Sequence, residues 1–222
     1  MKHGRIKMST SPFIITISRQ LGSGGAYIGQ QLAVKLNILY ADREIIQQAA
    51  KKLAVQEEML ERRDEKLSSF WKSFLRSYAF GNPDVYVPQK NNMPTSRELF
   101  EAETEAVTRI ARECSAVIIG RSGSYVLRDH PNHVSLFIHG DLPSRKSRVQ
   151  ETQQVSEEAA AKMIDQSDKE RALYHRTFTG REWADARRYH LAIDTGRMDL
   201  DKSVEVILKY VECRQATPGG AP

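Results

Sequence analysis

The sequence predicts an α/β domain in which a five-stranded parallel sheet carries helices on both faces. A short β-branched run, residues 14–18, leads directly into a glycine-rich turn and then into a segment of helical periodicity. Further short apolar runs follow, separated by segments with the apolar spacing of helices. Strands that alternate with helices pair in parallel, because each helix returns the chain to the same edge of the sheet. We therefore expect one sheet with helices packed on both sides.

The glycine-rich turn connects the first expected strand, 14–18, to a helix expected over 26–35. Its residues, with the first residue of the helix, are Gly22, Ser23, Gly24, Gly25 and Ala26. The helix shows Ile28, Leu32 and Leu36 at helical spacing. In a strand–glycine loop–helix unit, backbone N–H groups and the helix N-terminus together attract an anion. This unit is the candidate phosphate cradle.

The turn matches the phosphate-loop pattern G-x-x-x-x-G-K-[ST] only in part. Arg19 stands at the position of the first glycine, Gly25 at that of the lysine, and Ala26 at that of the Mg²⁺-binding hydroxyl. A degenerate motif also fits a tight turn whose glycines only let the strand and the helix pack closely. Both interpretations stay open at the level of the motif.

The remaining elements follow from apolar runs, caps and breakers. Asp42 is placed to cap the helix that follows the second strand, and Ser156 to cap a later one. Thr95-Ser96-Arg97-Glu98 has the form of a capping box. The further strands are expected at 38–40, 116–120, 134–138 and 189–193, and the further helices at 43 to about 80, 95–114, 143–149, from 156 onward and 201–214.

The sequence predicts one domain with a tail at each end and a long internal loop. We expect a basic tail at 1–12, one domain at 13–214 and a flexible tail at 215–222. Residues 79–94 contain Asn82-Pro83, Pro88 and Pro94, and form either a flap over a site or a disordered surface loop.

The composition is that of an ordinary soluble chain, with 40% hydrophobic and 27% charged residues among 222. No apolar run approaches the roughly 20 residues of a membrane span, and the basic N-terminus lacks the apolar region of a signal peptide. Cys114 and Cys213 are expected to be reduced packing residues on helices, which favours a cytoplasmic location. The net charge of +5 is spread along the chain, so we expect small anionic ligands, neither nucleic acid nor a membrane, and a homo-oligomer remains compatible with the sequence.

Arginines follow several of the expected strands, at the edge where ligands bind in parallel sheets. Arg19, Arg43 and Arg121 come directly after, or one residue after, the runs 14–18, 38–41 and 116–120. A guanidinium group binds two phosphate oxygens at once and stays charged. We expect Arg43 and Arg121 to converge on one phosphate.

These stretches give the chain a resemblance to the cytidylate kinase-like family. The resemblance rests on residues 15–19 with 22–25, Tyr40-Ala41-Asp42-Arg43-Glu44, Gly120-Arg121, and 168–171 through 179–183, and it spans about 13–212. It implies a P-loop fold of the nucleoside monophosphate kinase type, with a helical acceptor-side insertion at about 43–96 and a helical lid at about 156–183. It also implies ATP and Mg²⁺ as cofactors, and transfer of the γ-phosphoryl group of ATP to CMP or dCMP.

The resemblance also implies roles for individual residues. Residues 22–26 would bind the nucleotide. Tyr40, Asp42, Arg43 and Arg121 would bind the acceptor, although Ser122 stands where the family has an acid. Asp168 and Arg171 match the lid pattern Asp-x-x-Arg, and Ile164 replaces an arginine ahead of it, which leaves the preferred base open. The alternative for this charged stretch is a solvated helix with pairs such as Asp165–Lys169.

The absent lysine leaves the source of positive charge undecided. Either Arg19 folds back onto the phosphates, with Arg171 and Asp168 completing the catalytic set, or the lid arginines carry the whole charge. Arg19 could instead pair with Asp194 or Asp42 and brace the strand edge. The ligand of Mg²⁺ is unassigned, and Ser23 and Tyr27 carry the nearest hydroxyls.

Three functions are therefore compared. The first is a phosphotransferase that uses ATP and Mg²⁺ on a nucleoside monophosphate or a related small phosphorylated acceptor. The second is a non-catalytic protein that binds a nucleotide or another anion through a degenerate loop. The third is a partner-binding module in which residues 43–96 form the interface.

Overall fold

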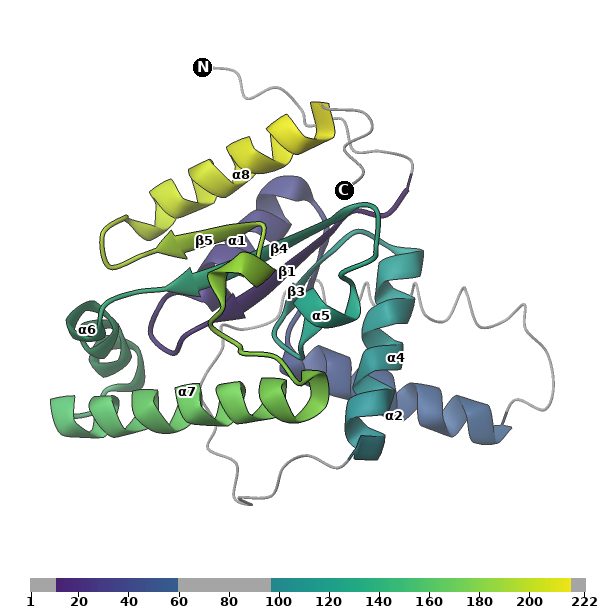
Figure 1. Ribbon diagram of the computed structural model, residues 1–222, viewed down its shortest axis with the longest axis horizontal. Coiled ribbons are helices and arrows are strands. Elements are labelled where there is room, and N and C mark those ends of the chain that lie inside the picture. Colours follow the sequence, from purple (N-terminus) through teal and green to yellow (C-terminus); the bar gives the residue numbers. More distant parts are fainter. Residues whose placement is uncertain (1–10, 60–96, 217–222) are drawn as a thin grey trace.

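The structure is a computed structural model, which describes residues 11–59 and 97–216 (Figure 1). Predictions for the N-terminal tail, the 79–94 loop, the 95–98 capping box, most of the partner interface and the C-terminal tail therefore lie outside the described residues, wholly or nearly so. The helices are α1 Gly25–Leu36, α2 Arg43–Met59, α4 Arg97–Glu113, α5 Gly123–Val126, α6 Leu142–Gln153, α7 Glu157–Thr179, the 3₁₀ turn η1 Ala186–Arg188, and α8 Leu200–Ala216.

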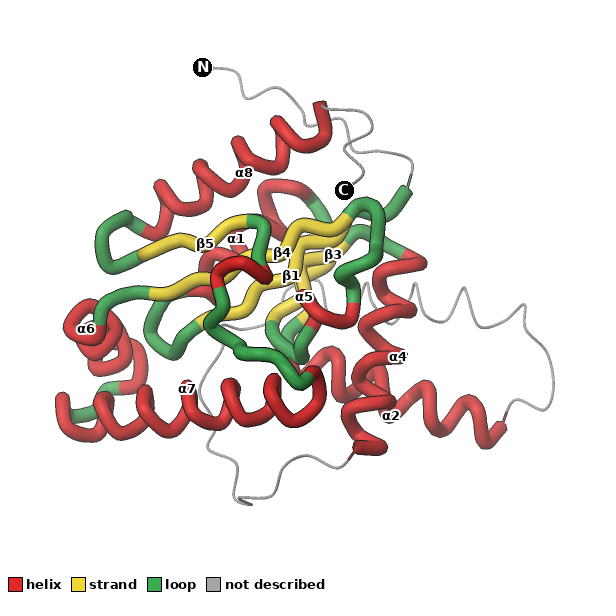
Figure 2. The backbone as a smooth tube through the Cα atoms, viewed as in Figure 1, coloured by secondary structure: helices red, strands yellow, loops and turns green. Residues whose placement is uncertain are grey.

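The strands form one five-stranded sheet in which every pairing is parallel, as expected. The spatial order is β2-β3-β1-β4-β5, so β1, which leads into the glycine-rich turn, lies at the centre. Figure 2 shows the strands as an inner layer with helices around them. The strand bounds are β1 Ile14–Arg19, β2 Leu39–Ala41, β3 Ala116–Ile119, β4 His133–His139 and β5 Leu191–Asp194.

Alternate residues of the central strand serve two separate cores. Ile15 and Ile17 point into one cluster with α1 and α8, and Ile14 points into another with α2 and α4. All three side chains are at most 1% exposed. Burying apolar area on both faces is the main stabilising contribution to a sheet of this kind. It also fixes β1, and therefore the start of the turn, in a rigid position.

Helices α6 and α7 lie together beyond the carboxyl ends of the strands (Figure 1). Both begin at side-chain caps: the Asp141 carboxylate accepts from the Ser144 N–H at 2.9 Å, and the Ser156 hydroxyl accepts from the Ala159 N–H at 3.2 Å. Asp42 caps α2 as predicted, because its Oδ1 accepts from the N–H groups of Glu44 and Ile45. The caps thus place three helices at the ligand edge of the sheet.

The elements differ from the expectation at the end of β3. The strand stops at Ile119, because Gly120, Arg121 and Ser122 all have positive φ, of 75°, 52° and 50°. The short helix α5 follows, and its apolar pattern is too short to be recognised in the sequence. Left-handed backbone at non-glycine residues costs of order 1–3 kcal/mol each and is concentrated at functional sites. The backbone conformation thus adds a second reason, beside the Gly120-Arg121 motif, to regard this bend as part of a site.

Among the described residues neither Cys114 nor Cys213 forms a disulfide, and only one of them packs as predicted. Cys114 is partly buried against the α2–α4 core, and burial raises the pKa of its thiol to about 11. Cys213 is exposed on α8, so its interpretation as a packing residue is wrong. Within the described part of the chain, no helix has both the length and the apolar character required to cross a bilayer.

Candidate functional site

The glycine-rich turn leaves the N-terminus of α1 open. Gly24 is the N-cap residue, and α1 therefore begins without a side-chain cap hydrogen bond. The first intrahelical bond is that from Ile28 N–H to Gly24 C=O, at 3.0 Å. The amides of residues 25–27 therefore lack helical acceptors by construction, and the helix end carries partial positive charge. This geometry can bind an anion.

Two glycines of the turn are also required by packing. Gly22 and Gly24 have φ of 77° and 75°, which other residues rarely adopt. A Cβ on Gly22 would lie 2.5 Å from the carbonyl oxygen of Arg145, and a Cβ on Gly24 would lie 2.6 Å from a methyl group of Leu200. The interpretation of the turn as a close-packed element is therefore supported, and its interpretation as a cradle stays a prediction.

Arg19 fills the space that a side chain at position 25 would need. A Cβ on Gly25 would lie 2.6 Å from the Arg19 Cβ and 2.9 Å from its Cγ. At the far end of the side chain, Nη1 lies 2.6 Å from where a Cβ on Gly120 would be. The Arg19 side chain thus runs past the start of α1 to the end of β3. The arginine at the first motif position and the glycine at the lysine position are two parts of one packing arrangement.

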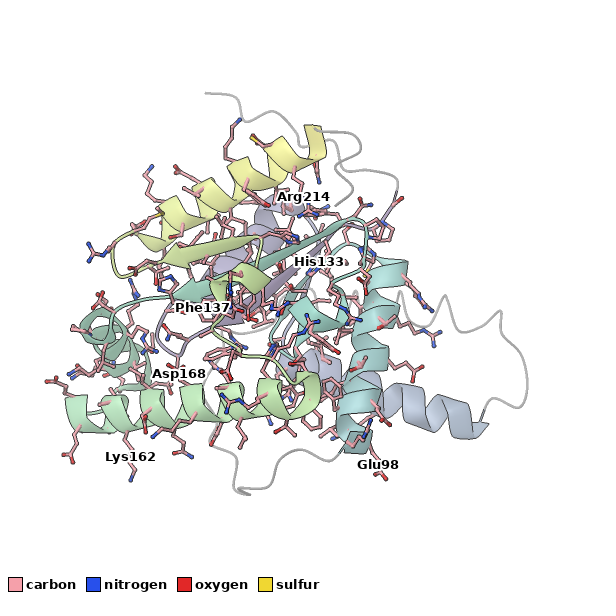
Figure 3. The ribbon with its side chains drawn as sticks, in the orientation of Figure 1. Glu98, His133, Phe137, Lys162, Asp168 and Arg214 are labelled. Atoms are coloured by element: carbon pink, nitrogen blue, oxygen red, sulfur yellow. The ribbon has the colours of Figure 1, made fainter. Side chains whose placement is uncertain are left out.

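The two α7 residues that the resemblance singled out both contact the region of the turn. Asp168 accepts from the Leu21 N–H at 3.0 Å through Oδ1 and binds Arg145 at 2.6 Å through Oδ2. Arg171 donates to the Arg19 carbonyl oxygen at 2.7 Å. Figure 3 shows Asp168 on the side of α7 that faces the sheet, with Lys162 pointing away from it. The Asp165–Lys169 pair also forms, at 2.7 Å, on the exposed side.

Two arginines of α6 belong to the site and were missed in the sequence. Arg145 donates to the Leu21 carbonyl oxygen at 3.2 Å, and Arg148 donates to that of Gly22 at 3.3 Å. The only signal in the sequence is their spacing, three apart in a helix that begins just after a strand. That spacing places both on one helix face toward the turn. A charged helix gives the same pattern, so the signal was not specific.

Arg121, just after the end of β3, is paired with a carboxylate. Its Nη1 lies 3.1 Å from Glu103 Oε2, and the two side chains are 9% and 1% exposed. Glu103 also accepts from the Tyr174 hydroxyl at 2.8 Å and from the Gln47 amide at 3.3 Å. Burial is the main reason that the pKa of the Tyr174 phenol is raised. The Glu103 carboxylate thus connects α2, α4, α7 and the end of β3.

Ser122, which replaces the acid of the family motif, contacts a histidine. Its hydroxyl lies 3.3 Å from His175 Nδ1, and both residues are buried. Burial lowers the pKa of His175, and the nearby charge of Arg181 lowers it further. The neutral imidazole is therefore favoured at this position.

The remaining expected acceptor residues lie at the end of β2 and the start of α2. The Tyr40 ring is 2% exposed and packs in the core beneath α1. Asp42 is engaged as the cap of α2, as described above. Arg43 is the first residue of α2 and is half-buried. The contacts of the described residues join Arg121 to Glu103, so the predicted convergence of Arg43 and Arg121 stays a prediction.

Both hydroxyl groups considered as Mg²⁺ ligands donate a hydrogen bond to another residue. The Ser23 hydroxyl donates to the Gln20 carbonyl oxygen at 2.8 Å, and that of Tyr27 donates to Asp201 at 2.7 Å. Among the described residues, no group of three or more His, Cys, Asp or Glu side chains is arranged to hold a metal ion. A protein ligand for Mg²⁺ is thus not assigned to either residue.

The model of the cytidylate kinase-like family matches residues 14–197, which include the turn, the end of β3, α6 and α7. The chain belongs to the cytidylate kinase-like family. A bifunctional pantoate ligase/cytidylate kinase of Prochlorococcus marinus (strain MIT 9301) is 25% identical over 172 residues. That match covers 71% of this chain but only 32% of the relative, so the chain spans about a third of the bifunctional protein.

Solved structures confirm the fold expected of a cytidylate kinase-like protein. An uncharacterised protein from Eubacterium ventriosum ATCC 27560 is 27% identical and superimposes with a TM-score of 0.68, over 90% of this chain and 98% of the other. A gluconokinase from Sinorhizobium meliloti 1021 has a TM-score of 0.52 at 14% identity, over 94% and 95% of the two chains. The second likeness concerns the fold alone. The P-loop kinase fold expected from the sequence is thus shown.

Proposed function

We propose that this cytidylate kinase-like protein transfers the γ-phosphoryl group of ATP to a nucleoside monophosphate of the CMP or dCMP type, or to a related small phosphorylated acceptor. The observation that carries the proposal is the path of Arg19, which brings a guanidinium group from the first motif position to the end of β3. In this arrangement Arg19, at the other end of the loop, supplies the positive charge that a lysine at position 25 would have provided.

The donor side of the proposal rests on the turn. The open N-terminus of α1 provides N–H groups for phosphate oxygens, and residues 22–26 form the cradle. Phosphoryl transfer requires little covalent participation by the protein, so positioning and neutralisation of charge supply most of the catalysis. A cradle held rigidly by β1 and α1 meets the first requirement, and Arg19 meets the second.

Arg19 is assigned the catalytic role of the missing lysine. Its side chain occupies the space beside Gly25, where a lysine would begin, and its guanidinium group lies across the ends of β1 and β3. The phosphates of a nucleotide in a site that excludes water need a cation close by. Arg171 and Asp168 are assigned the task of holding α7 over the turn, through the Arg19 carbonyl and the Leu21 N–H.

Mg²⁺ enters the proposal as the ion that ATP carries. Mg²⁺ keeps several waters and binds phosphate oxygens readily, so a nucleotide complex needs few ligands from the protein. The hydroxyls of Ser23 and Tyr27 are engaged in other hydrogen bonds. We therefore assign no residue of this chain to the metal. A cytoplasmic location, where ATP and nucleoside monophosphates occur together, fits this activity.

The acceptor side is centred on Arg121. An acceptor phosphate would compete with the Glu103 carboxylate for the Arg121 guanidinium, since the two now form a buried pair. A dianionic phosphate offers more charge and more acceptor oxygens than one carboxylate. Arg43, Asp42 and Tyr40 stay in the proposal as acceptor residues on the strength of their match to the family. Arg121→Ala should raise the KM of the acceptor more than that of ATP.

The alternative is a non-catalytic protein that binds nucleotides or anions. The absence of the motif lysine favours it, because Gly25 carries no charge. The experiment is incubation with ATP, Mg²⁺ and each nucleoside monophosphate, with measurement of ADP and nucleoside diphosphate. Steady formation of product, above that of a Gly24→Asp control, supports the kinase.

Saturable binding of nucleotide without product supports the alternative. The control places a carboxylate at the N-cap of α1, where it competes with phosphate for the N–H groups of the first helical turn. Circular dichroism must show that the control remains folded. If neither product nor binding is found, the kinase and a nucleotide-binding role are both excluded, which leaves the partner-binding module.

A further inference from the structure

Side chains hold the carbonyl groups of residues 19–23, at the start of the turn. Four of the five donors come from outside this segment: from α6, from α7 and from the residue just after β5. Five consecutive carbonyl oxygens, from Arg19 to Ser23, each accept at least one hydrogen bond from a side chain. The donors, in order along the turn, are Arg171 at 2.7 Å, the Ser23 hydroxyl at 2.8 Å, Arg145 at 3.2 Å, Arg148 at 3.3 Å and the Thr195 hydroxyl at 2.8 Å.

Holding a carbonyl also fixes the next amide. In a trans peptide the C=O of one residue and the N–H of the next point in opposite directions. When Thr195 holds the Ser23 carbonyl, the Gly24 N–H is directed to the other side of the peptide plane. A free glycine peptide could rotate and lose this direction, because glycine populates several regions of backbone space. The glycine turn thus depends on bonds from outside itself.

Arg148 and Thr195 form one unit in this arrangement. The Arg148 Nη2 donates to the Thr195 carbonyl oxygen at 2.5 Å, while its Nη1 lies 3.3 Å from both the Thr195 hydroxyl and the Gly22 carbonyl oxygen. The Thr195 hydroxyl lies 2.9 Å from the His139 carbonyl oxygen as well, and Thr195 is 1% exposed. One forked guanidinium group therefore ties α6, the end of β5 and the turn together.

We infer that Arg148 and Thr195 are positioning residues for nucleotide binding: they hold the carbonyls of Gly22 and Ser23 so that the turn presents its amides to phosphate. This inference rests on the proposed nucleotide-binding function and adds two residues to it. Neither acts as a catalytic residue, since both work through the backbone of the turn. The guanidinium fork matters more than the charge, because its three hydrogen bonds go to neutral oxygen atoms.

The experiment compares ATP binding, by titration calorimetry in the presence of Mg²⁺, for the wild type, Arg148→Lys, Arg148→Met, Thr195→Val and Thr195→Ser. Lysine keeps the charge but cannot make the fork, so Arg148→Lys should weaken ATP binding about as much as Arg148→Met. Each lost hydrogen bond should raise the Kd by about two- to tenfold. Thr195→Ser keeps the hydroxyl and should retain near wild-type affinity, whereas Thr195→Val should not.

The matched control is Lys146→Met on the same helix. Lys146 binds Glu157 on α7, so the control removes one charge and one α6–α7 contact without touching the turn. Its Kd for ATP should stay within twofold of the wild type. Thermal unfolding of every variant separates loss of affinity from loss of fold, and titrations are run well below each melting temperature.

The outcomes separate this inference from the proposed function. If the wild type binds no ATP, the proposed nucleotide site itself is wrong, and the inference is wrong with it. If the wild type binds ATP and Arg148→Lys binds equally well, Arg148 acts by charge and the positioning role is overturned. Equal affinity of Thr195→Val and the wild type would overturn it as well.

Discussion

The packing of the Arg19 side chain beside Gly25 can be tested by substituting both residues, singly and together. In the structure a Cβ at position 25 would lie 2.6 Å from the Arg19 Cβ, and neither atom is at the flexible end of a side chain. Gly25→Ala should therefore force a backbone shift and lower the free energy of unfolding by about 1–3 kcal/mol, the usual cost of overpacking. In an Arg19→Gly background the same substitution meets no obstacle. It should then be neutral or stabilising, because alanine favours a helix more than glycine does.

The assay is a double-mutant cycle with urea unfolding of the wild type, Gly25→Ala, Arg19→Gly and the double variant. We expect a coupling energy of about 1–3 kcal/mol between the two positions. Residues that are independent would show additive changes within about 0.5 kcal/mol. Additivity would mean that Arg19 does not occupy the space beside Gly25, and the reasoning would be refuted.

Binding of nucleotide extends the same cycle to function. Arg19→Ala should weaken ATP binding by about 1.5–3 kcal/mol, the range of a hydrogen bond to a charged group, with little change in melting temperature. Arg19→Gly combined with Gly25→Lys moves the charge to the usual motif position and should bind ATP more tightly than Arg19→Gly alone. A fall in melting temperature with unchanged affinity for Arg19→Ala would instead identify Arg19 as a brace of the strand edge.

Three further predictions concern other buried charges. Burial, and then the nearby charges of His190, His130 and Arg214, lower the pKa of His133 from 6.5 to about 3. Between these two pKa values the unfolded state binds one more proton than the folded state, so the free energy of unfolding should fall by up to about 1.4 kcal/mol per pH unit as the pH drops below 6.5. In urea unfolding His133→Gln should reduce this pH dependence, and an unchanged pH dependence would contradict the role given to His133. Glu103→Gln leaves Arg121 buried without its anion and should lower the free energy of unfolding by about 3–5 kcal/mol. The double variant Glu103→Leu, Arg121→Met should recover most of this loss. Equal stability of the wild type, Glu103→Gln and the double variant would contradict the buried ion pair. Asp168→Asn should speed amide exchange in 157–179 by about ten- to 150-fold, since α7 loses charge-assisted bonds to Leu21 and Arg145, whereas the exposed control Asp165→Asn should leave it unchanged.

The order and type of the main elements could be predicted from the sequence. Apolar runs such as 14–18 and 116–119 are buried on both faces, so they are recognisable without any partner. Caps are local as well, which is why Asp42 and Ser156 were placed correctly. The glycine turn was recognised as a candidate cradle for the same reason, because strand, turn and helix are contiguous in the chain.

Tertiary structure decided which charges serve the site. The sequence does not distinguish Arg121, Arg145, Arg148 and Arg171 by role. In the structure Arg121 pairs with Glu103 on α4, and the other three donate to carbonyl groups of residues 19–22. The partners of each arginine are far away along the chain, as in the 152 residues between Arg171 and Arg19. Propensity and spacing report only on near neighbours, so such contacts are invisible to them. The same limit applies to Gly25: its sequence position shows that the lysine is gone, and only packing against Arg19 shows what took its space.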